Sequence, residues 1–263
     1  MHHKIWLCLL ALYLPFTSEA KIVETQHIAD VVPLVDADTW FLVDLDNTMF
    51  EAKQALGHAN WFYDRMQECL KNGMSRDAAI AVLYPDWIKT QKICDVKALE
   101  SDFVPSMVAM QNQGIVVMGF TARQPSVADS TLRQIASLGF DFTKTAPSKE
   151  TFTIPPRMPT LYTGGVLFVS DYNKKSDVLN AFLKIINKTP KKIVFIDDKR
   201  KNLEEMEVEF NKQGVDYIGV FYTAIDHENP PVYSRELADF QYKYLDSIMS
   251  NEAAALLMQS GVK

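Results

Sequence analysis

Cysteine and long apolar runs are both scarce in this chain of 263 residues. It holds three cysteines, and beyond the first 20 residues no apolar run is long enough for a transmembrane helix. Basic residues do not exceed acidic ones, since 27 Lys and Arg stand against 33 Asp and Glu, a net charge of −6. The lack of a basic block argues against binding to a nucleic-acid polymer, whose phosphates need a positive surface. Repeats and low-complexity tracts are also absent, and 48% hydrophobic residues suffice for a full globular core.

The first 20 residues are typical of a secretory signal peptide. A short, weakly basic start precedes the apolar run from Ile5 to Phe16, which is too short to span a bilayer. Ser18 and Ala20 then offer small residues at the cleavage positions. We therefore expect cleavage after Ala20, which makes residues 1–20 a signal peptide and residues 21–263 the mature chain. The expected location is secreted or periplasmic, without stable membrane insertion.

Export would leave two cysteines, Cys69 and Cys94, in an oxidising compartment. A disulfide between them would close a loop of about 25 residues. Two separately buried thiols explain the same residues equally well. A mobility shift on a non-reducing gel distinguishes the two alternatives.

Apolar strands alternate with helical segments along the mature chain, which is typical of a doubly wound α/β sheet with mostly parallel strands. Between the first two strands lie about 65 largely helical residues, more than a usual crossover needs. We assign residues 53–100 to a helical insertion, in which Ser75 caps a helix that Pro85 ends. Residues 21–39 and 143–160 are predicted to be mainly loop. Strands are expected at 40–43, 115–120, 166–169, 192–196 and 215–222, with a hairpin turn at 163–165, and helices at 102–113, 124–138, 174–187 and 233–258.

Carboxylates follow two of these predicted strands. Asp44 and Asp46 come after the buried strand 40–43, and Asp197 and Asp198 come after a later one. Neighbouring carboxylates repel unless a cation lies between them or a proton is shared, so packing alone does not call for them. Hard, oxygen-seeking Mg²⁺ prefers such ligands, and α/β folds bind their ligands outside the carboxyl ends of the strands. The structural alternatives are a turn at Asp46 and a helix cap at Asp198.

Thr121 and Lys175 complete a set of residues suited to a phosphoryl group. Thr121 ends the strand 115–120, although it could also merely cap the next helix. Lys174 and Lys175 open a helix, where a cation opposes the helix dipole by about 0.3–1 kcal/mol unless an anion binds there. We interpret the set as carboxylates holding Mg²⁺, with Thr121 and Lys175 holding phosphoryl oxygens. One carboxylate can then attack phosphorus while a second transfers the proton.

Taken in order, these motifs resemble those of the haloacid dehalogenase (HAD) superfamily, the aspartate-nucleophile phosphatases. Asp-Leu-Asp-Asn-Thr at 44–48, Thr-Ala-Arg at 121–123, Lys175 and Ile-Asp-Asp at 196–198 occur in the family's order and contexts. The resemblance implies a mostly parallel, Rossmann-like HAD sheet with a small helical type-1 cap inserted after the first strand, here residues 53–100. Within the superfamily, the chain resembles a secreted bacterial family of unassigned function.

The resemblance also implies roles for individual residues. Asp44 would be the nucleophile and a Mg²⁺ ligand. Asp46 would be the general acid/base and would contribute its backbone carbonyl to the metal. Lys175 would stabilise negative charge on the phosphoryl group. The other expected residues are Thr121, Ala122 and Arg123 around the substrate, Asp197 and Asp198 at the metal, and Asn202 as an orienting group.

The insertion carries several aromatic residues after the first motif. Trp61, Phe62, Tyr63 and Trp87 could stack on an organic leaving group or simply form the core of the cap, and His58 is a further candidate substrate contact. We therefore expect a secreted, Mg²⁺-dependent phosphatase that hydrolyses small phosphomonoesters through an aspartyl-phosphate intermediate. The alternative is an exported HAD-fold binding or effector protein with little or no catalytic activity. The sequence specifies neither the leaving group nor the oligomeric state.

Overall fold

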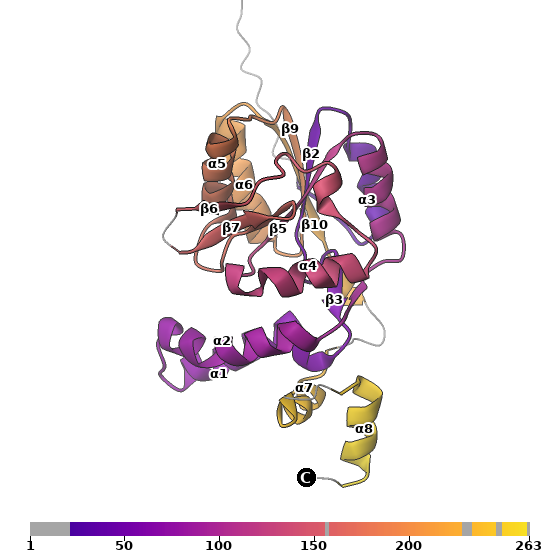
Figure 1. Ribbon diagram of the computed structural model, residues 1–263, viewed down its shortest axis with the longest axis vertical. Coiled ribbons are helices and arrows are strands. Elements are labelled where there is room, and N and C mark those ends of the chain that lie inside the picture. Colours follow the sequence, from indigo (N-terminus) through magenta and orange to yellow (C-terminus); the bar gives the residue numbers. More distant parts are fainter. Residues whose placement is uncertain (1–21, 156–157, 228–232, 246–248, 262–263) are drawn as a thin grey trace, which may run out of the picture.

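An eight-stranded, mostly parallel sheet forms the centre of the protein in the computed structural model, which describes residues 22–155, 158–227, 233–245 and 249–261 (Figure 1). The strand order is β1-β10-β9-β2-β5-β8-β7-β6. Pairing is parallel from β1 to β8, and β7 and β6 add antiparallel to that edge. The mixed α/β class and the mostly parallel sheet expected from the sequence are confirmed. The strands are β1 (Ile22–Thr25), β2 (Thr39–Val43), β5 (Val116–Thr121), β6 (Phe152–Ile154), β7 (Thr160–Thr163), β8 (Val166–Phe168), β9 (Lys192–Asp197) and β10 (Asp216–Tyr222).

The strand order changes direction between β2 and β9. From β2 the chain adds β5 and then β8 on one side, and it returns to add β9 and β10 on the other. Thr39 to Val43 pair in parallel with Lys192 to Ile196, so the carboxyl ends of β2 and β9 lie side by side. Such a change of direction is where open α/β sheets bind ligands. The residues that follow β2 and β9 therefore lie where this type of sheet binds its ligands.

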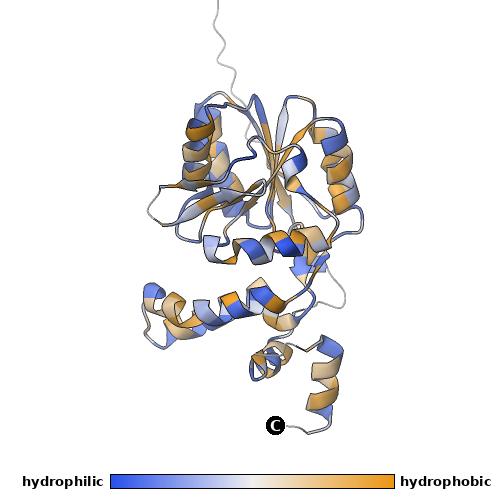
Figure 2. Cartoon of the chain, viewed as in Figure 1, coloured by the Kyte–Doolittle hydropathy of each residue, from blue (hydrophilic) through white to orange (hydrophobic). Residues whose placement is uncertain are grey.

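Helices cover both faces of the sheet. Side chains alternate along a strand, so Phe41 and Val43 of β2 face one core cluster and Leu42 faces the other. Because both faces are buried, the central strands read as continuous apolar runs. The helices around the sheet carry both apolar and hydrophilic residues (Figure 2). The first core includes residues of α3 (Phe103–Asn112) and α4 (Ala128–Ser137), and the second includes residues of α5 (Lys175–Ile186) and α6 (Arg200–Lys212).

A helical hairpin lies between β2 and β5 in the sequence. Its helices α1 (Ala59–Lys71) and α2 (Arg76–Ile93) lie apart from the sheet, on the far side of α4 (Figure 1). The Ser75 hydroxyl caps α2 by accepting a hydrogen bond from the Ala78 amide at 3.2 Å, as predicted. The expected helical insertion is therefore present, with the hairpin as its main part.

Two predictions about the insertion are wrong. Pro85 does not end its helix, because α2 continues to Ile93 and buries Leu83 and Trp87 in a core shared with α1. This burial outweighs the one backbone hydrogen bond that proline removes. The end of the insertion is not helical either, since β4 (Val96–Ala98) pairs antiparallel with β3 (Phe50–Ala52). This small sheet joins the chain entering the insertion to the chain leaving it.

Two further strands lie in segments predicted to be loop. The four residues of β1 pair with β10 at one edge of the sheet, and β6 pairs with β7 at the other. A strand this short gains its order from its partner, so its own sequence carries little signal. The hairpin between β7 and β8 is confirmed. Gly164 and Gly165 have φ values of 57° and 75°, which a tight turn of this type needs and glycine supplies.

The C-terminal segment, for which the sequence predicts one helix or a helix pair, forms two helices that pack against the insertion. In Figure 1 both helices lie beyond α1 and α2, away from the sheet. The Gln241 side chain accepts a hydrogen bond from the Leu56 amide at 2.9 Å, and the Asn251 side chain accepts one from the Ala55 amide at 3.1 Å. Ala238 is buried in the same core as α1 and α2. The two helices are α7 (Arg235–Tyr242) and α8 (Asn251–Gln259).

Cys69 and Cys94 are both free thiols, Cys94 buried and Cys69 partly buried. Of the two alternatives, the structure therefore contains separate thiols. Among the described residues no helix is both long and apolar enough to cross a membrane. The expected signal peptide, residues 1–20, lies outside the described residues.

Candidate functional site

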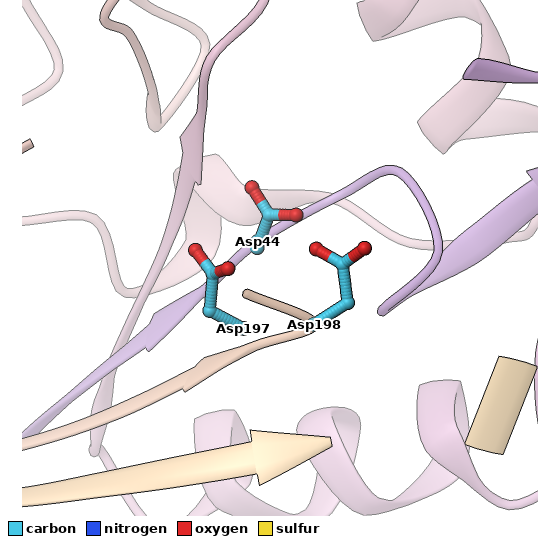
Figure 3. A group of neighbouring side chains, drawn as sticks. All are labelled: Asp44, Asp197 and Asp198. Carbon is cyan, nitrogen blue, oxygen red and sulfur yellow. The ribbon is translucent and has the colours of Figure 1, made fainter. Parts of the chain in front are cut away.

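Three carboxylates meet where β2 and β9 end. Asp44 directly follows β2, and its amide donates to the Ile196 carbonyl at 3.0 Å. Asp197 is the last residue of β9, and Asp198 follows it. One carboxylate oxygen from each of the three lies within 4.8 Å of the others. Figure 3 shows these carboxylates grouped around a common space. The fold thus brings together acids that are far apart in the sequence.

Lys175 bridges two of these acids from the start of α5. Its Nζ donates to Asp44 Oδ1 and Asp197 Oδ2, each at 2.6 Å, and to the Phe120 carbonyl at 2.8 Å. Burial lowers the pKa of an ammonium, but the two carboxylates prevail and raise the Lys175 pKa above its ordinary value. Lys174 is exposed, so Lys175 is the lysine that faces the site.

In addition to the Lys175 ammonium, the three clustered acids favour the binding of protons or of a further cation. Burial raises the pKa of Asp44 to about 8; the Lys175 ammonium opposes this, and the charges of Asp197 and Asp198 add to it. Burial and the Asp197 charge likewise raise the Asp198 pKa to about 6. Carboxylate oxygens so close together are the donor set that a hard divalent cation prefers. The three residues could therefore hold a hard divalent cation.

Two asparagines and one amide orient the cluster. Asn202 Nδ2 donates to both Asp197 oxygens, at 3.0 and 2.9 Å, and the Lys199 amide donates to Asp197 Oδ1 at 2.8 Å. Asn47 Nδ2 donates to Asp198 Oδ2 at 3.3 Å. Asn202 thus contacts an acid of the cluster, as an orienting residue would. Asn47 had been interpreted from the sequence only as a turn former.

Arg123 pairs with Asp46 and also lines the pocket. Its Nε and Nη2 donate to the two Asp46 oxygens, each at 2.7 Å. Its Nη1 donates to Thr131 at 2.9 Å and Gln134 at 2.6 Å. Burial would raise the Asp46 pKa, but the guanidinium prevails and lowers it. Four of its five N–H groups therefore have partners in the protein, which gives Arg123 a positioning role toward Asp46. The expected contact between Arg123 and a substrate stays a prediction.

Thr121 and Ala122 reach the same site from the end of β5. Both residues line the pocket beside Asp44 and Asp46. The Thr121 hydroxyl accepts a hydrogen bond from the Arg123 amide at 3.1 Å, which fixes the turn that carries this motif. Thr121 is buried, and its position is compatible with the expected contact to a phosphoryl oxygen.

The insertion supplies an aromatic wall to the pocket above the cluster. The empty volume of this pocket is about 570 Å³, which includes open solvent at its mouth. The wall consists of Phe62 and Tyr63 from α1 and Tyr84 and Trp87 from α2. Phe62 packs against Trp87 and Tyr84, with ring centroids 5.4 and 6.1 Å apart.

Trp61 and His58, two candidates for substrate contact, are not among the residues that line this pocket. Trp61 belongs to the core of the insertion, which was the alternative for this residue. Trp61 Nε1 donates to Asp239 of α7 at 3.2 Å. His58 stacks on Tyr233 with ring centroids 5.3 Å apart, and its Nδ1 accepts from the Asn60 amide at 3.2 Å. Both side chains belong to the contact between the insertion and the C-terminal segment. Their sequence position beside the first motif gave no sign of this.

Three pocket residues were not foreseen: Tyr84, Asp171 and Lys199. Lys199 Nζ donates to the Tyr63 hydroxyl at 2.6 Å and lies 4.6 Å from the centroid of that ring. Asp171 lies in the loop between β8 and α5. The Asp-Asp-Lys run could have drawn attention to Lys199. Nothing in the sequence marks Asp171 or Tyr84, because their place depends on how the insertion packs.

The family described as "Protein of unknown function (DUF2608)" matches residues 24–255. A Chlamydia trachomatis serovar D protein named "Putative outer membrane protein" is 33% identical over 254 residues, 95% of each chain. A similarly named Chlamydia pneumoniae protein is 32% identical over 261 residues, 97% of this chain and 98% of the relative. An uncharacterized Rickettsia prowazekii protein is 28% identical over 238 residues, 84% of each chain. No solved structure matches the chain. The chain therefore belongs to the DUF2608 family, whose function is unknown.

Proposed function

We propose that this protein is a Mg²⁺-dependent phosphatase of the HAD type that hydrolyses small phosphomonoesters. The observation that carries the proposal is the meeting of Asp44, Asp197 and Lys175 in one buried cluster, with 2.6 Å from the ammonium to each acid. Four short motifs that are weak singly converge on one point of the fold. A structural role alone does not require three acids and a lysine to be buried together at the ligand-binding edge of a sheet.

The bound metal would be held by Asp44, Asp197 and Asp198, with the backbone carbonyl of Asp46 as a further oxygen ligand. Mg²⁺ supplies positive charge that neutralises phosphoryl oxygens. The pocket and the cluster together hold five carboxylates and three cationic side chains among the described residues. A divalent cation would balance this excess of negative charge. Asn202 would keep the Asp197 carboxylate oriented toward the ion.

The reaction would run in two halves on Asp44. One Asp44 oxygen attacks phosphorus, the bond from phosphorus to the leaving oxygen breaks, and Asp46 gives that oxygen a proton. Water then attacks the aspartyl-phosphate, and Asp46 takes a proton from it, which releases phosphate and restores Asp44. Lys175 and Thr121 hold negative phosphoryl oxygens in both halves. Arg123 keeps Asp46 directed at the pocket and favours its ionised form, which suits the second half best.

The helical insertion would be the cap of this phosphatase. In a HAD phosphatase with a type-1 cap, the insertion follows the first strand and covers the leaving group, and here α1 and α2 contribute the aromatic wall. Its extent is better described by the two-stranded sheet at its base than by the boundaries 53–100. The α7–α8 segment would act as a brace for the cap. A cap of this kind excludes water from the reacting group.

Export is part of the same proposal. The sequence begins with the features of a signal peptide, and two of the relatives named above are called outer membrane proteins. We infer that the mature protein acts outside the cytoplasm, in the periplasm or beyond it. Detection of a form beginning at Lys21 in an extracytoplasmic fraction would test this, and an uncleaved cytoplasmic form would contradict it.

One observation favours the alternative of an exported binding protein with little or no activity. Arg123 occupies both oxygens of Asp46 and lowers its pKa, which opposes the protonated form needed to assist a leaving group. In that case the pocket would bind a ligand without turning it over. The two functions differ in whether Asp44 chemistry occurs at all.

Hydrolysis of 4-nitrophenyl phosphate by the mature chain tests the proposal. We expect turnover with Mg²⁺, loss of turnover in EDTA, and loss in Asp44→Asn with the fold retained by circular dichroism. The matched control is Asp216→Asn, an exposed acid at the start of β10, at the opposite end of the sheet. Equal rates for Asp44→Asn and wild type would end the assignment of Asp44. Absence of turnover across a broad phosphomonoester panel would favour the binding protein.

A further inference from the structure

The aromatic wall of the pocket contains one carboxylate that the proposed chemistry does not use. Asp171 lines the pocket together with Phe62, Tyr84 and Trp87, and it belongs to neither the metal cluster nor the Arg123 pair. It lies on a loop of the sheet domain, whereas the three rings come from the insertion. The two halves of the pocket therefore offer different chemistry to a leaving group.

The Asp171 side chain has no hydrogen bond or ion pair with any other residue that the structure describes. Burial raises its pKa, and the more distant charges of Lys199 and Arg76 offset only part of that rise. A partly buried carboxylate without a partner is costly, because desolvation is not compensated by a contact. A ligand group that pairs with Asp171 would remove that cost.

Lys199 and Arg76 are the two cations whose charges act most on Asp171, but both side chains are engaged elsewhere. The Arg76 guanidinium lies over the Tyr172 ring, 5.4 Å from its centroid. Lys199 Nζ donates to the Tyr63 hydroxyl and lies against the Tyr63 ring. Arg123 is likewise used by Asp46, Thr131 and Gln134. The cation that Asp171 lacks would therefore come from the ligand.

Two kinds of leaving group fit an aromatic wall. A flat aromatic alcohol would stack on the rings but leave Asp171 without a partner. An alkylammonium group would contact both the rings and Asp171, since aromatic faces attract a cation and the carboxylate pairs with it. Aromatic residues and an acid around a quaternary ammonium are a general way to bind this chemistry.

We propose that Asp171 and the rings of Phe62, Tyr84 and Trp87 form a subsite for a quaternary alkylammonium group. The substrate class is then a phosphomonoester of an ammonium alcohol, of which phosphocholine is the simplest probe. This inference rests on the proposed phosphatase function for its substrate and on the pocket alone for its ligand. Asp171 is a specificity-determining residue in this scheme and takes no part in bond breaking.

A pair of isosteric substrates tests the subsite. Phosphocholine and 3,3-dimethylbutyl phosphate have the same shape and differ in the charge of one atom. We expect the wild type to favour phosphocholine in kcat/KM by about tenfold, the order of a desolvated cation–π contact. Asp171→Asn should lower this ratio, because the carboxylate is lost while the rings remain; Asp171→Glu should retain more of the preference, and the control Asp216→Asn should keep it all. An equal ratio in wild type and Asp171→Asn would overturn the subsite while leaving the phosphatase intact.

Binding of the alcohols alone separates this inference from the proposed function. Choline and 3,3-dimethylbutanol can be titrated against the mature chain by calorimetry or by the fluorescence of Trp87, with wild type and Asp171→Asn compared. Tighter binding of choline that Asp171→Asn weakens supports the subsite, even if neither phosphate ester is hydrolysed and the phosphatase proposal fails. Equal binding of the two alcohols overturns it.

Discussion

Asp44→Asn is expected to stabilise the metal-free protein at neutral pH, although it removes the proposed nucleophile. Burial raises the pKa of Asp44 from an ordinary value of 3.8 to about 8, with Lys175 opposing the rise and Asp197 and Asp198 adding to it. The folded chain therefore holds a proton on this acid that the unfolded chain has lost. Between the two pKa values, stability falls as the pH rises, because deprotonation favours the unfolded chain. Asparagine carries no such proton, so this part of the pH dependence disappears.

The size of the effect follows from the pKa difference. One proton changes the free energy of unfolding by about 1.4 kcal/mol per pH unit. Over about two pH units, from about 5.5 to 7.5, the wild type would lose at most about 3 kcal/mol that Asp44→Asn retains. The value is an upper limit because Asp198 shares the same repulsion. In a chain of this length it corresponds to about 5–10 °C in Tm.

Thermal unfolding in EDTA at a series of pH values measures this directly. Asp44→Asn should match the wild type near pH ~5.5 and exceed it near pH ~7.5, whereas Asp216→Asn should follow the wild type throughout. Adding Mg²⁺ should stabilise the wild type more at the higher pH, since the ion competes with protons for the ligands, and should stabilise Asp44→Asn less. If Asp44→Asn keeps the pH slope of the wild type in EDTA, the account of a crowded, proton-binding cluster is refuted.

Three other substitutions probe the groups around the cluster. Lys175→Met should lower the free energy of unfolding in EDTA by about 3–5 kcal/mol, because it leaves two buried acids without their cation. It should also abolish turnover. An unchanged midpoint of urea unfolding would contradict the effect on stability. Arg123→Lys should raise the pKa of Asp46, because the bidentate pair is lost. The acidic limb of the profile of kcat against pH should therefore move to higher pH. An unmoved limb would show that Asp46 does not transfer the proton. Asn202→Ala should weaken Mg²⁺ binding by about 10–100-fold, measured by titrating activity with the metal, because Asp197 loses two orienting hydrogen bonds; wild-type affinity would show that Asn202 is dispensable.

The sequence predicts the position of a site residue well where that residue directly follows a recognisable strand. Asp44 and Asp197 follow apolar runs that are long enough to be recognised as strands, and parallel strands deliver their carboxyl ends to one edge. The choice of Lys175 over Lys174, in contrast, rests on the resemblance to the HAD motifs. The convergence of these residues therefore follows from the order of strands and helices alone.

Other features depend on contacts that no local pattern records. Pro85 lies inside α2 because the helix packs against α1, and proline propensity alone predicts an end there. Arg123 was placed at the site correctly, but its pairing with Asp46 depends on how the end of β5 meets the end of β2. Asp171 and Tyr84 meet only after the insertion has docked. The spacing of residues along the chain carries no information about such tertiary contacts.

The hydrogen bonds beneath the insertion have a consequence for the order of folding. The Leu56 amide is bonded to a side chain 185 positions later and the Ala55 amide to one 196 positions later. These backbone groups lack their native partners until almost the whole polypeptide has left the ribosome, and contacts of such long sequence separation close slowly. The contact between the insertion and the C-terminal segment is therefore completed late, and a chain delivered unfolded to a translocation pore would still have to form it on the far side.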